Sequence, residues 1–83
     1  MIEELKVFTE ELVKSLVIES DLVKVQNFED EEENPIIEIM VSESDMGKVI
    51  GRSGKMAKAI RTLIQAAAYN KGIKRVKINI DSF

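Results

Sequence analysis

The chain has 83 residues, of which 45% are hydrophobic and 33% are charged, a balance typical of one small globular domain. It contains no cysteine, which excludes a disulfide framework, and no histidine, which removes the commonest metal ligand and general base. No apolar run approaches the roughly 18 residues of a membrane span, and the N-terminus lacks the pattern of a signal peptide. We therefore expect a cytoplasmic protein with no membrane association.

The net charge of −3 conceals an uneven distribution of charge along the chain. Residues 1–45 contain 14 acidic and 3 basic side chains, whereas residues 46–83 contain 9 basic and 1 acidic side chain. A basic half within an acidic protein favours a local polyanion-binding face over indiscriminate coating of nucleic acid. Chance alone can also produce such a division in a short chain.

The first 41 residues predict one helix followed by two strands. Over Ile2 to Val17, four apolar residues recur at helical spacing and are expected to face the core: Leu5, Phe8, Leu12 and Leu16. Two segments then alternate apolar and polar side chains and are predicted as strands, 22–28 and 36–41. Residues 29–35, five consecutive acids ending in Asn-Pro, predict a solvated hairpin loop. This loop lacks the ligand spacing and the glycine of a calcium loop, so we expect no calcium site.

The second half predicts two helices separated by a glycine loop. A turn at 42–45 precedes a helix of about one turn at 46–50, and Ser44 or Asp45 is placed to cap that helix. A longer helix is expected over 55–69. Its predicted apolar stripe comprises Met56, Ile60, Leu63, Ile64, Ala67 and Ala68.

The last predicted element is a strand at 75–81, in which apolar and polar side chains alternate. Gly72 is expected to end the preceding helix in a left-handed backbone conformation. The resulting order is α-β-β-α-α-β, without a repeat or a linker. Three strands with helices packed on one face make a two-layer α+β fold, and we expect a single domain over 1–83.

The candidate site is the loop between the last two helices. Gly51 and Gly54 stand three residues apart, with Arg52 and Ser53 between them. Glycine permits positive φ and allows the backbone to approach a phosphodiester chain closely. The N-terminus of the following helix adds unpaired N–H groups and a partial positive charge. This arrangement resembles the loop of KH domains, which clamp about four nucleotides of single-stranded nucleic acid.

Residues on both sides of the loop are expected to complete a nucleic-acid-binding surface. Positive charge comes from four further side chains: Lys48, Lys55, Lys58 and Arg61. Apolar side chains beside the loop offer a floor for bases: Val49, Ile50 and Met56. Binding would then combine a backbone clamp, which fixes position, with base contacts in a shallow groove that give modest sequence preference.

Each of these features also has a purely structural interpretation. The two glycines can form a tight turn between helices, Ile50 and Met56 can belong to the core, and Lys58 and Arg61 can form an ordinary solvated face. Nucleoside triphosphate binding is excluded by spacing, because a P-loop places four residues between its glycines. No dinucleotide fingerprint and no catalytic set accompany the loop, so we expect no enzyme, no cofactor and no metal.

Residues 45–63, which read DMGKVIGRSGKMAKAIRTL, resemble the centre of a type II KH domain. The resemblance is closest to the small one-domain bacterial RNA-binding proteins of the KhpA family, and it extends over essentially the whole chain. It implies a type II KH fold and single-stranded RNA binding without catalysis. It assigns the backbone clamp to 51–54 and the groove to residues near Ile50.

The resemblance also implies partners and a cellular role. Members of this family associate with themselves and with a larger RNA-binding protein of the Jag or KhpB type, which carries its own KH domain. The family is linked to post-transcriptional control and, in some bacteria, to cell shape and division. The acidic loop at 29–33 is longer and more acidic than the family pattern, and we expect it to lie away from the RNA.

Two other functions stay open. The chain could be a KH-fold dimerisation module with weak nucleic-acid binding, although such a surface has no need of Arg52 and Lys55. It could also bind single-stranded DNA, because no residue pattern in the sequence indicates a contact with the 2′-hydroxyl that distinguishes RNA from DNA.

Overall fold

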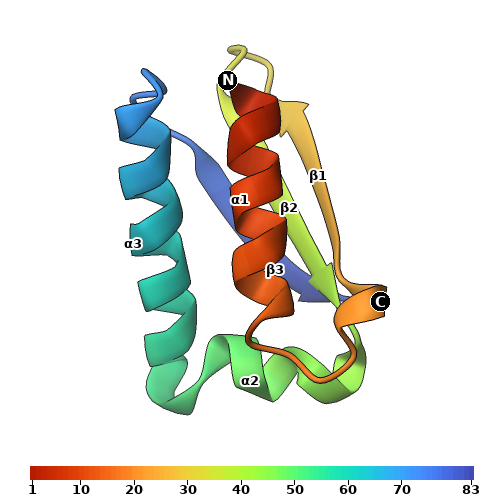
Figure 1. Cartoon of the computed structure of the whole chain (residues 1–83). Helices are drawn as coiled ribbons and strands as arrows, with labels where there is room; N and C mark the ends of the chain where they lie inside the picture. The colour runs from red at the N-terminus through yellow and green to blue at the C-terminus, as the bar shows by residue number, and fades with distance from the viewer.

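A three-stranded sheet carries one layer of helices on one of its faces (Figure 1). The computed structural model describes all residues, 1–83. The strands lie in the order β1-β2-β3 and span Lys24–Glu29, Pro35–Val41 and Lys77–Ser82. The helices are α1 (Ile2–Lys14), α2 (Met46–Ile50) and α3 (Lys55–Asn70). The predicted α-β-β-α-α-β order and two-layer α+β class are confirmed.

Strand pairing places the glycine loop in a crossover connection. β1 and β2 form an antiparallel hairpin in which Val25 lies opposite Ile39. β2 and β3 are parallel, with Ile37 opposite Ile78, and parallel neighbours require a long connection. That connection consists of α2, the loop and α3, so both ends of the loop are anchored to helices packed on the sheet.

The alternation along β2 determines which face of the sheet is covered. Ile37, Ile39 and Val41 are fully buried beneath the helices, as their spacing of two predicts. Val23, immediately before β1, and Val25, within it, are also buried beneath the helices. The apolar core therefore lies between this face and the helix layer.

The buried face of α1 differs from the predicted one. The helix ends at Lys14, and its buried residues are Leu5, Thr9 and Val13. Phe8, predicted to face the core, is 37% exposed. The burial of Thr9 carries no penalty from its hydroxyl, because Thr9 Oγ1 donates to the carbonyl of Leu5 at 2.8 Å. The polar Thr9 is thus buried where the apolar pattern predicts Phe8.

The buried face of α3 also departs from the predicted stripe. It consists of Ala57, Ile60, Ile64 and Ala68. Met56 and Leu63, predicted to be in the core, are 37% and 50% exposed. Small side chains at both ends of the buried face allow α3 to pack closely, which turns two of the larger apolar residues towards solvent. The helix ends as predicted, because Gly72 follows it with φ +84°.

Asp45 does not cap α2, contrary to the prediction. Its side chain is buried, and its carboxylate accepts the backbone N–H groups of Ile18 (3.2 Å) and Glu19 (2.9 Å). The Ser42 hydroxyl donates to the same carboxylate at 3.1 Å. These hydrogen bonds, led by that from Glu19, lower the pKa of Asp45 against the opposing effect of desolvation. Asp45 thereby ties the connection after α1 to the start of α2.

The acidic hairpin loop is exposed, as predicted, and it is also ordered. The Asp30 carboxylate accepts the backbone N–H groups of Glu32 and Asn34, each at 2.9 Å. The bond from Asn34 is the main reason that the pKa of Asp30 lies below its ordinary value. Two predicted loop residues, Glu29 and Pro35, belong to the strands and pair with each other. None of the helices combines the length and apolar composition that crossing a bilayer requires.

Candidate nucleic-acid interface

The loop between α2 and α3 has a positive φ at three of its four residues. The φ angles are 76° at Gly51, 57° at Ser53 and 75° at Gly54. Gly51 donates its N–H to the carbonyl of Gly47 (2.9 Å) and ends α2, and Gly54 donates to the carbonyl of Gly51 (3.2 Å). The turn is therefore closed by its own backbone.

The two glycines of the loop are required for different reasons. A Cβ at Gly51 would lie 2.6 Å from the Cβ of Met56 and 2.9 Å from its backbone nitrogen, so any side chain would collide with the first turn of α3. A Cβ at Gly54 would meet nothing within 4 Å, so this position needs glycine only for its positive φ. Gly51 thus allows the loop and α3 to be in direct contact.

The N-terminus of α3 faces the loop, and the backbone N–H of Lys55, its first residue, donates to the carbonyl of Arg52 within the loop. Gly54 is the N-cap residue, no side chain caps the helix, and its first turn contains no acidic residue. Lys55 instead places a cation at the positive end of the helix dipole, where it is unfavourable. An anion bound at this end would neutralise Lys55 and lie at the positive end of the helix dipole.

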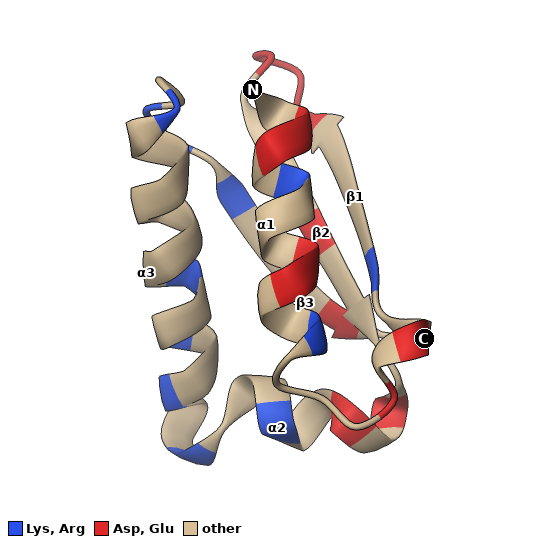
Figure 2. Ribbon diagram, viewed as in Figure 1, with Lys and Arg blue, Asp and Glu red and all other residues tan.

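Four basic side chains surround this helix end and form no ion pair: Lys48, Arg52, Lys55 and Lys58. All four are exposed. The two ion pairs of the protein, Lys14–Glu10 and Lys71–Glu4, lie elsewhere. Figure 2 shows basic residues along α2, the loop and the first half of α3, a stretch with no acidic residue, and further basic residues on α1, β1, β3 and the connection after α3. The acidic residues lie mainly on the hairpin, α1 and the turn before α2. The structure therefore brings these four predicted residues together, with Ser53 exposed between them.

Arg61 differs from these four free cations because its side chain is hydrogen-bonded to the backbone. Its Nε donates to the backbone carbonyl of Ile78 at 3.3 Å, so the guanidinium is tied to β3. One turn further along α3, Gln65 donates to the carbonyl of Val76 and accepts the N–H of Val76 at 3.4 Å. Sequence reasoning missed Gln65. The spacing of four between Arg61 and Gln65 could have indicated a shared helix flank, but their backbone partners become evident only with the strand in place.

The apolar residues beside the loop divide between core and surface. Val49 is fully buried, Ile50 is half-buried, and Met56 is 37% exposed. The three pockets of the molecule all lie elsewhere, so the surface around the loop is shallow. No group of three acidic side chains is placed to hold a metal ion. The arrangement offers phosphate-binding groups beside a small apolar surface.

Comparison with known proteins places this geometry in a family. The model of the KhpA/KhpB KH domain family matches residues 6–80. The RNA-binding protein KhpA of Borreliella burgdorferi is 49% identical over 69 residues, which cover 83% of this chain and 82% of the relative. The RNA-binding protein KhpA of Clostridium acetobutylicum is 46% identical over 76 residues, which cover 92% and 99%.

A solved structure supports the fold independently. The chain superposes on the crystal structure of Era in complex with MgGDPNP and nucleotides 1506–1542 of 16S ribosomal RNA with a TM-score of 0.68. The sequence identity is 21%, and the match covers 95% of this chain and 30% of the other. The predicted KH fold is confirmed, and the chain belongs to the KhpA/KhpB KH domain family.

Proposed function

We propose that the protein binds single-stranded RNA through the loop at 51–54 and acts without catalysis. The observation that carries the proposal is the group of four unpaired cations around the uncapped N-terminus of α3. The names of the relatives, which are RNA-binding proteins, support RNA as the polyanion. The proposal includes a cytoplasmic location, and it includes the role in post-transcriptional control that the family resemblance implies.

In the proposed complex, the loop positions the RNA backbone. Phosphate oxygens lie at the positive end of the α3 dipole and accept from the exposed side chains of Arg52 and Ser53. Lys48 and Lys55 neutralise the phosphates on either side, and Lys58 extends the positive charge along α3. Because Gly51 carries no Cβ, the loop stays close to α3 and the phosphates reach the helix end.

Bases are proposed to lie beside the loop, over Ile50 and the exposed part of Met56. Arg61 is proposed to act at the far side of this surface, where it is held by its bond to the Ile78 carbonyl. A planar guanidinium fixed in this way can stack on a base while it contacts β3. Such a site reads few bases and selects RNA mainly by its flexible single-stranded backbone.

We further propose that the protein works as a dimer, either with a second copy or with a larger KH-containing RNA-binding protein of the Jag or KhpB type. Exposed apolar residues on one side of α3 support this: Ala59, Leu63 and Ala66. They recur at spacings of three and four along the helix and form an apolar stripe. The stripe is exposed to water in the monomer, and the surface of a partner would bury it. Two linked sites would multiply the weak affinity of one loop through effective concentration.

The test compares binding of fluorescein-labelled single-stranded RNA, matched DNA and duplex RNA to three proteins. The first is the wild type, and the second carries Arg52→Asp with Ser53→Asp. The third carries Lys24→Asp with Gln26→Asp, which makes the same charge change on exposed positions of β1. We expect the loop variant alone to lose binding while its circular dichroism spectrum stays that of the wild type.

Two outcomes would redirect the proposal. Equal loss in both double variants would mean that net charge, not the loop, governs binding. Equal weak binding by all three proteins, together with a stable dimer in sedimentation, would favour the interaction-module function supported by the α3 stripe.

A further inference from the structure

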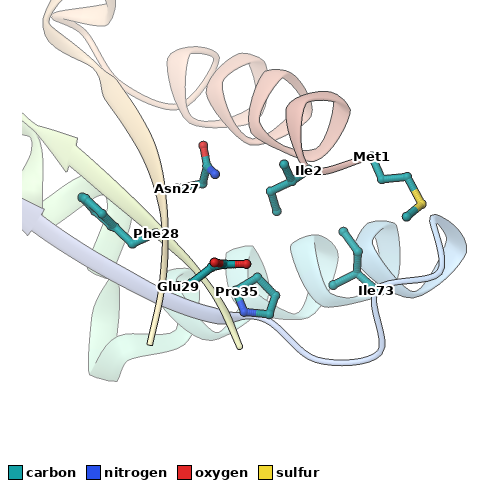
Figure 3. Close-up of a pocket in the computed structure, with 7 residues that line it drawn as sticks. All are labelled: Met1, Ile2, Asn27, Phe28, Glu29, Pro35 and Ile73. Atoms are coloured by element: carbon teal, nitrogen blue, oxygen red, sulfur yellow. The ribbon is translucent and has the colours of Figure 1, made fainter. Parts of the chain in front are cut away.

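A pocket lies near the acidic hairpin, at the end of the helix layer away from the glycine loop (Figures 1 and 3). It is an open pocket of about 560 Å³ where the start of α1, the β1–β2 hairpin and the connection after α3 meet. The residues that line it are Met1, Ile2, Asn27, Phe28, Glu29, Pro35 and Ile73. None of them takes part in the proposed RNA site.

The pocket exists because the core ends before the sheet does. Along the face of β1 that the helices cover, Val23 and Val25 are buried, but the next two positions are Asn27 and Glu29, which are exposed. Figure 3 shows Ile2, Pro35 and Ile73 around the resulting gap. The ring of Phe28 points away from it.

The pocket combines apolar walls with a free carboxylate. Glu29 forms no ion pair, and three further exposed glutamates without ion pairs follow in the hairpin: Glu31, Glu32 and Glu33. No lysine or arginine lines the pocket. Lys77 acts on Asp30 electrostatically, but it pairs in register with Ile36 and so lies on the helix-free face of the sheet. Lys74 and Arg75, which follow Ile73, are exposed in the connection to β3.

We propose that this pocket binds a short basic peptide segment of a partner protein, one in which a lysine or arginine stands beside an apolar residue. The methylene stem of such a side chain packs on Ile2 and Ile73, and its cation reaches Glu29. The hairpin glutamates attract the flanking basic residues of the segment, and the same carboxylates repel nucleic acid. Charge complementarity therefore selects a cationic peptide over RNA at this end of the molecule.

The proposal gives the protein two sites of opposite charge preference. The pocket is lined by 7 residues, whereas a stable protein interface involves roughly 20–30 residues on each side, so the contact is weak and reversible. Because the hairpin and the glycine loop lie at different ends of the fold, RNA and the basic segment can be bound together. The inference does not depend on RNA binding, and its test uses no RNA.

The test is a titration of the full chain with a capped peptide, acetyl-Gly-Leu-Lys-Leu-Arg-Gly-amide, followed by nuclear magnetic resonance. Its matched control peptide has norleucine and citrulline in place of the lysine and arginine. We expect the basic peptide to shift the amide resonances of Asn27, Glu29 and Ile73, and the neutral peptide to shift none of them. Glu29→Lys should weaken binding about tenfold, because an attraction becomes a repulsion.

Two further variants separate a pocket from a diffuse acidic surface. Ile73→Asn keeps the charge and should weaken binding about fivefold through lost apolar contact. Glu43→Lys makes the same charge change as Glu29→Lys at an exposed site outside the pocket, and should leave the affinity within about twofold.

Three results would overturn the proposal. The first is the absence of shifts at the pocket up to millimolar peptide, and the second is equal weakening by Glu43→Lys and Glu29→Lys. The third is a shift of the pocket resonances of Asn27, Glu29 and Ile73 that depends on protein concentration without peptide, which would identify a second copy as the occupant.

Discussion

The carboxylate of Asp45 accepts the backbone N–H of Glu19 at 2.9 Å, which joins two points of the chain that are 26 residues apart. The same carboxylate accepts from Ile18 and Ser42 and is buried at the base of α2. Since α2 leads directly into the glycine loop, this aspartate connects the packing of α1 to the position of the candidate site.

Asp45→Ala is expected to destabilise the protein strongly, because it leaves the backbone N–H groups of Ile18 and Glu19 without an acceptor. Ser42→Ala removes the bond to Asp45 and the contact with the Ser44 hydroxyl but leaves the two backbone N–H groups bonded, so it should have a clearly smaller effect. Urea denaturation followed by circular dichroism measures both. Equal effects of the two variants would show that the backbone bonds to Asp45 contribute little.

The stability should fall in acid, and Asp45→Asn should weaken that dependence. Hydrogen bonds hold the pKa of Asp45 in the folded protein below the ordinary 3.8 of an aspartate. A carboxyl group with a lowered folded pKa stabilises fully above its unfolded pKa, and this contribution disappears as the pH falls through the folded pKa. Denaturation curves from about pH 6 to about pH 2 measure the effect. Parallel curves for wild type and variant would contradict it.

Three glycine-to-alanine variants should rank in stability as the backbone geometry dictates. Gly51→Ala should cost at least about 2 kcal/mol, since it combines a positive φ with a collision against Met56. Gly54→Ala should cost about 1 kcal/mol, because only φ is unfavourable. Gly47→Ala, inside α2 with open space around it, should be neutral or stabilise by about 0.5 kcal/mol. Thermal denaturation gives the order, and an inverted order for Gly51 and Gly54 would refute the collision.

Substitutions at two neighbouring residues of α3 should change the stability by very different amounts. Leu63 is 50% exposed, so Leu63→Gln should change the stability of the monomer by less than about 0.5 kcal/mol. Ile64 is fully buried, and Ile64→Ala should cost about 2–4 kcal/mol. Denaturation at low protein concentration measures both. Sedimentation of Leu63→Gln then reports whether the exposed stripe supports self-association.

RNA binding should show a moderate dependence on salt. Two to four phosphate contacts predict a slope of about −1.5 to −3 in a plot of log K against log salt concentration for a single strand. Lys55→Gln should reduce the magnitude of this slope by about 0.7. Fluorescence anisotropy between low and moderate salt measures it. A slope near zero would mean that no phosphates are contacted.

The sequence predicts the strands and the loop well because their signals are local. Alternation along 36–41 determines the buried face of β2, and two glycines with the right spacing indicate the turn. The helix faces were predicted less well, because apolar size is an incomplete guide to burial. Thr9 is buried since its own helix satisfies its hydroxyl, and Ala57 is buried since α3 packs closely there.

Contacts between residues that are far apart in the sequence could not be predicted from the sequence pattern. Asp45 precedes a helix and has the chemistry of a cap, yet its partners lie 26 and 27 residues earlier in the chain. Gln65 and Arg61 look like ordinary polar residues of a helix, and only the position of β3 reveals what they bind. In both places the side chain satisfies backbone groups that the secondary structure leaves unpaired.

The closed turn with positive φ at Gly51, Ser53 and Gly54 has a kinetic consequence. The loop acquires its shape when the protein folds, since its internal bond and its contact with Met56 do not depend on a ligand. A preorganised host loses little conformational entropy on association, so the ordering cost of the complex falls on the flexible nucleic acid. Capture should therefore follow a single bimolecular step, and affinity differences between sequences should arise from the rate at which the strand leaves.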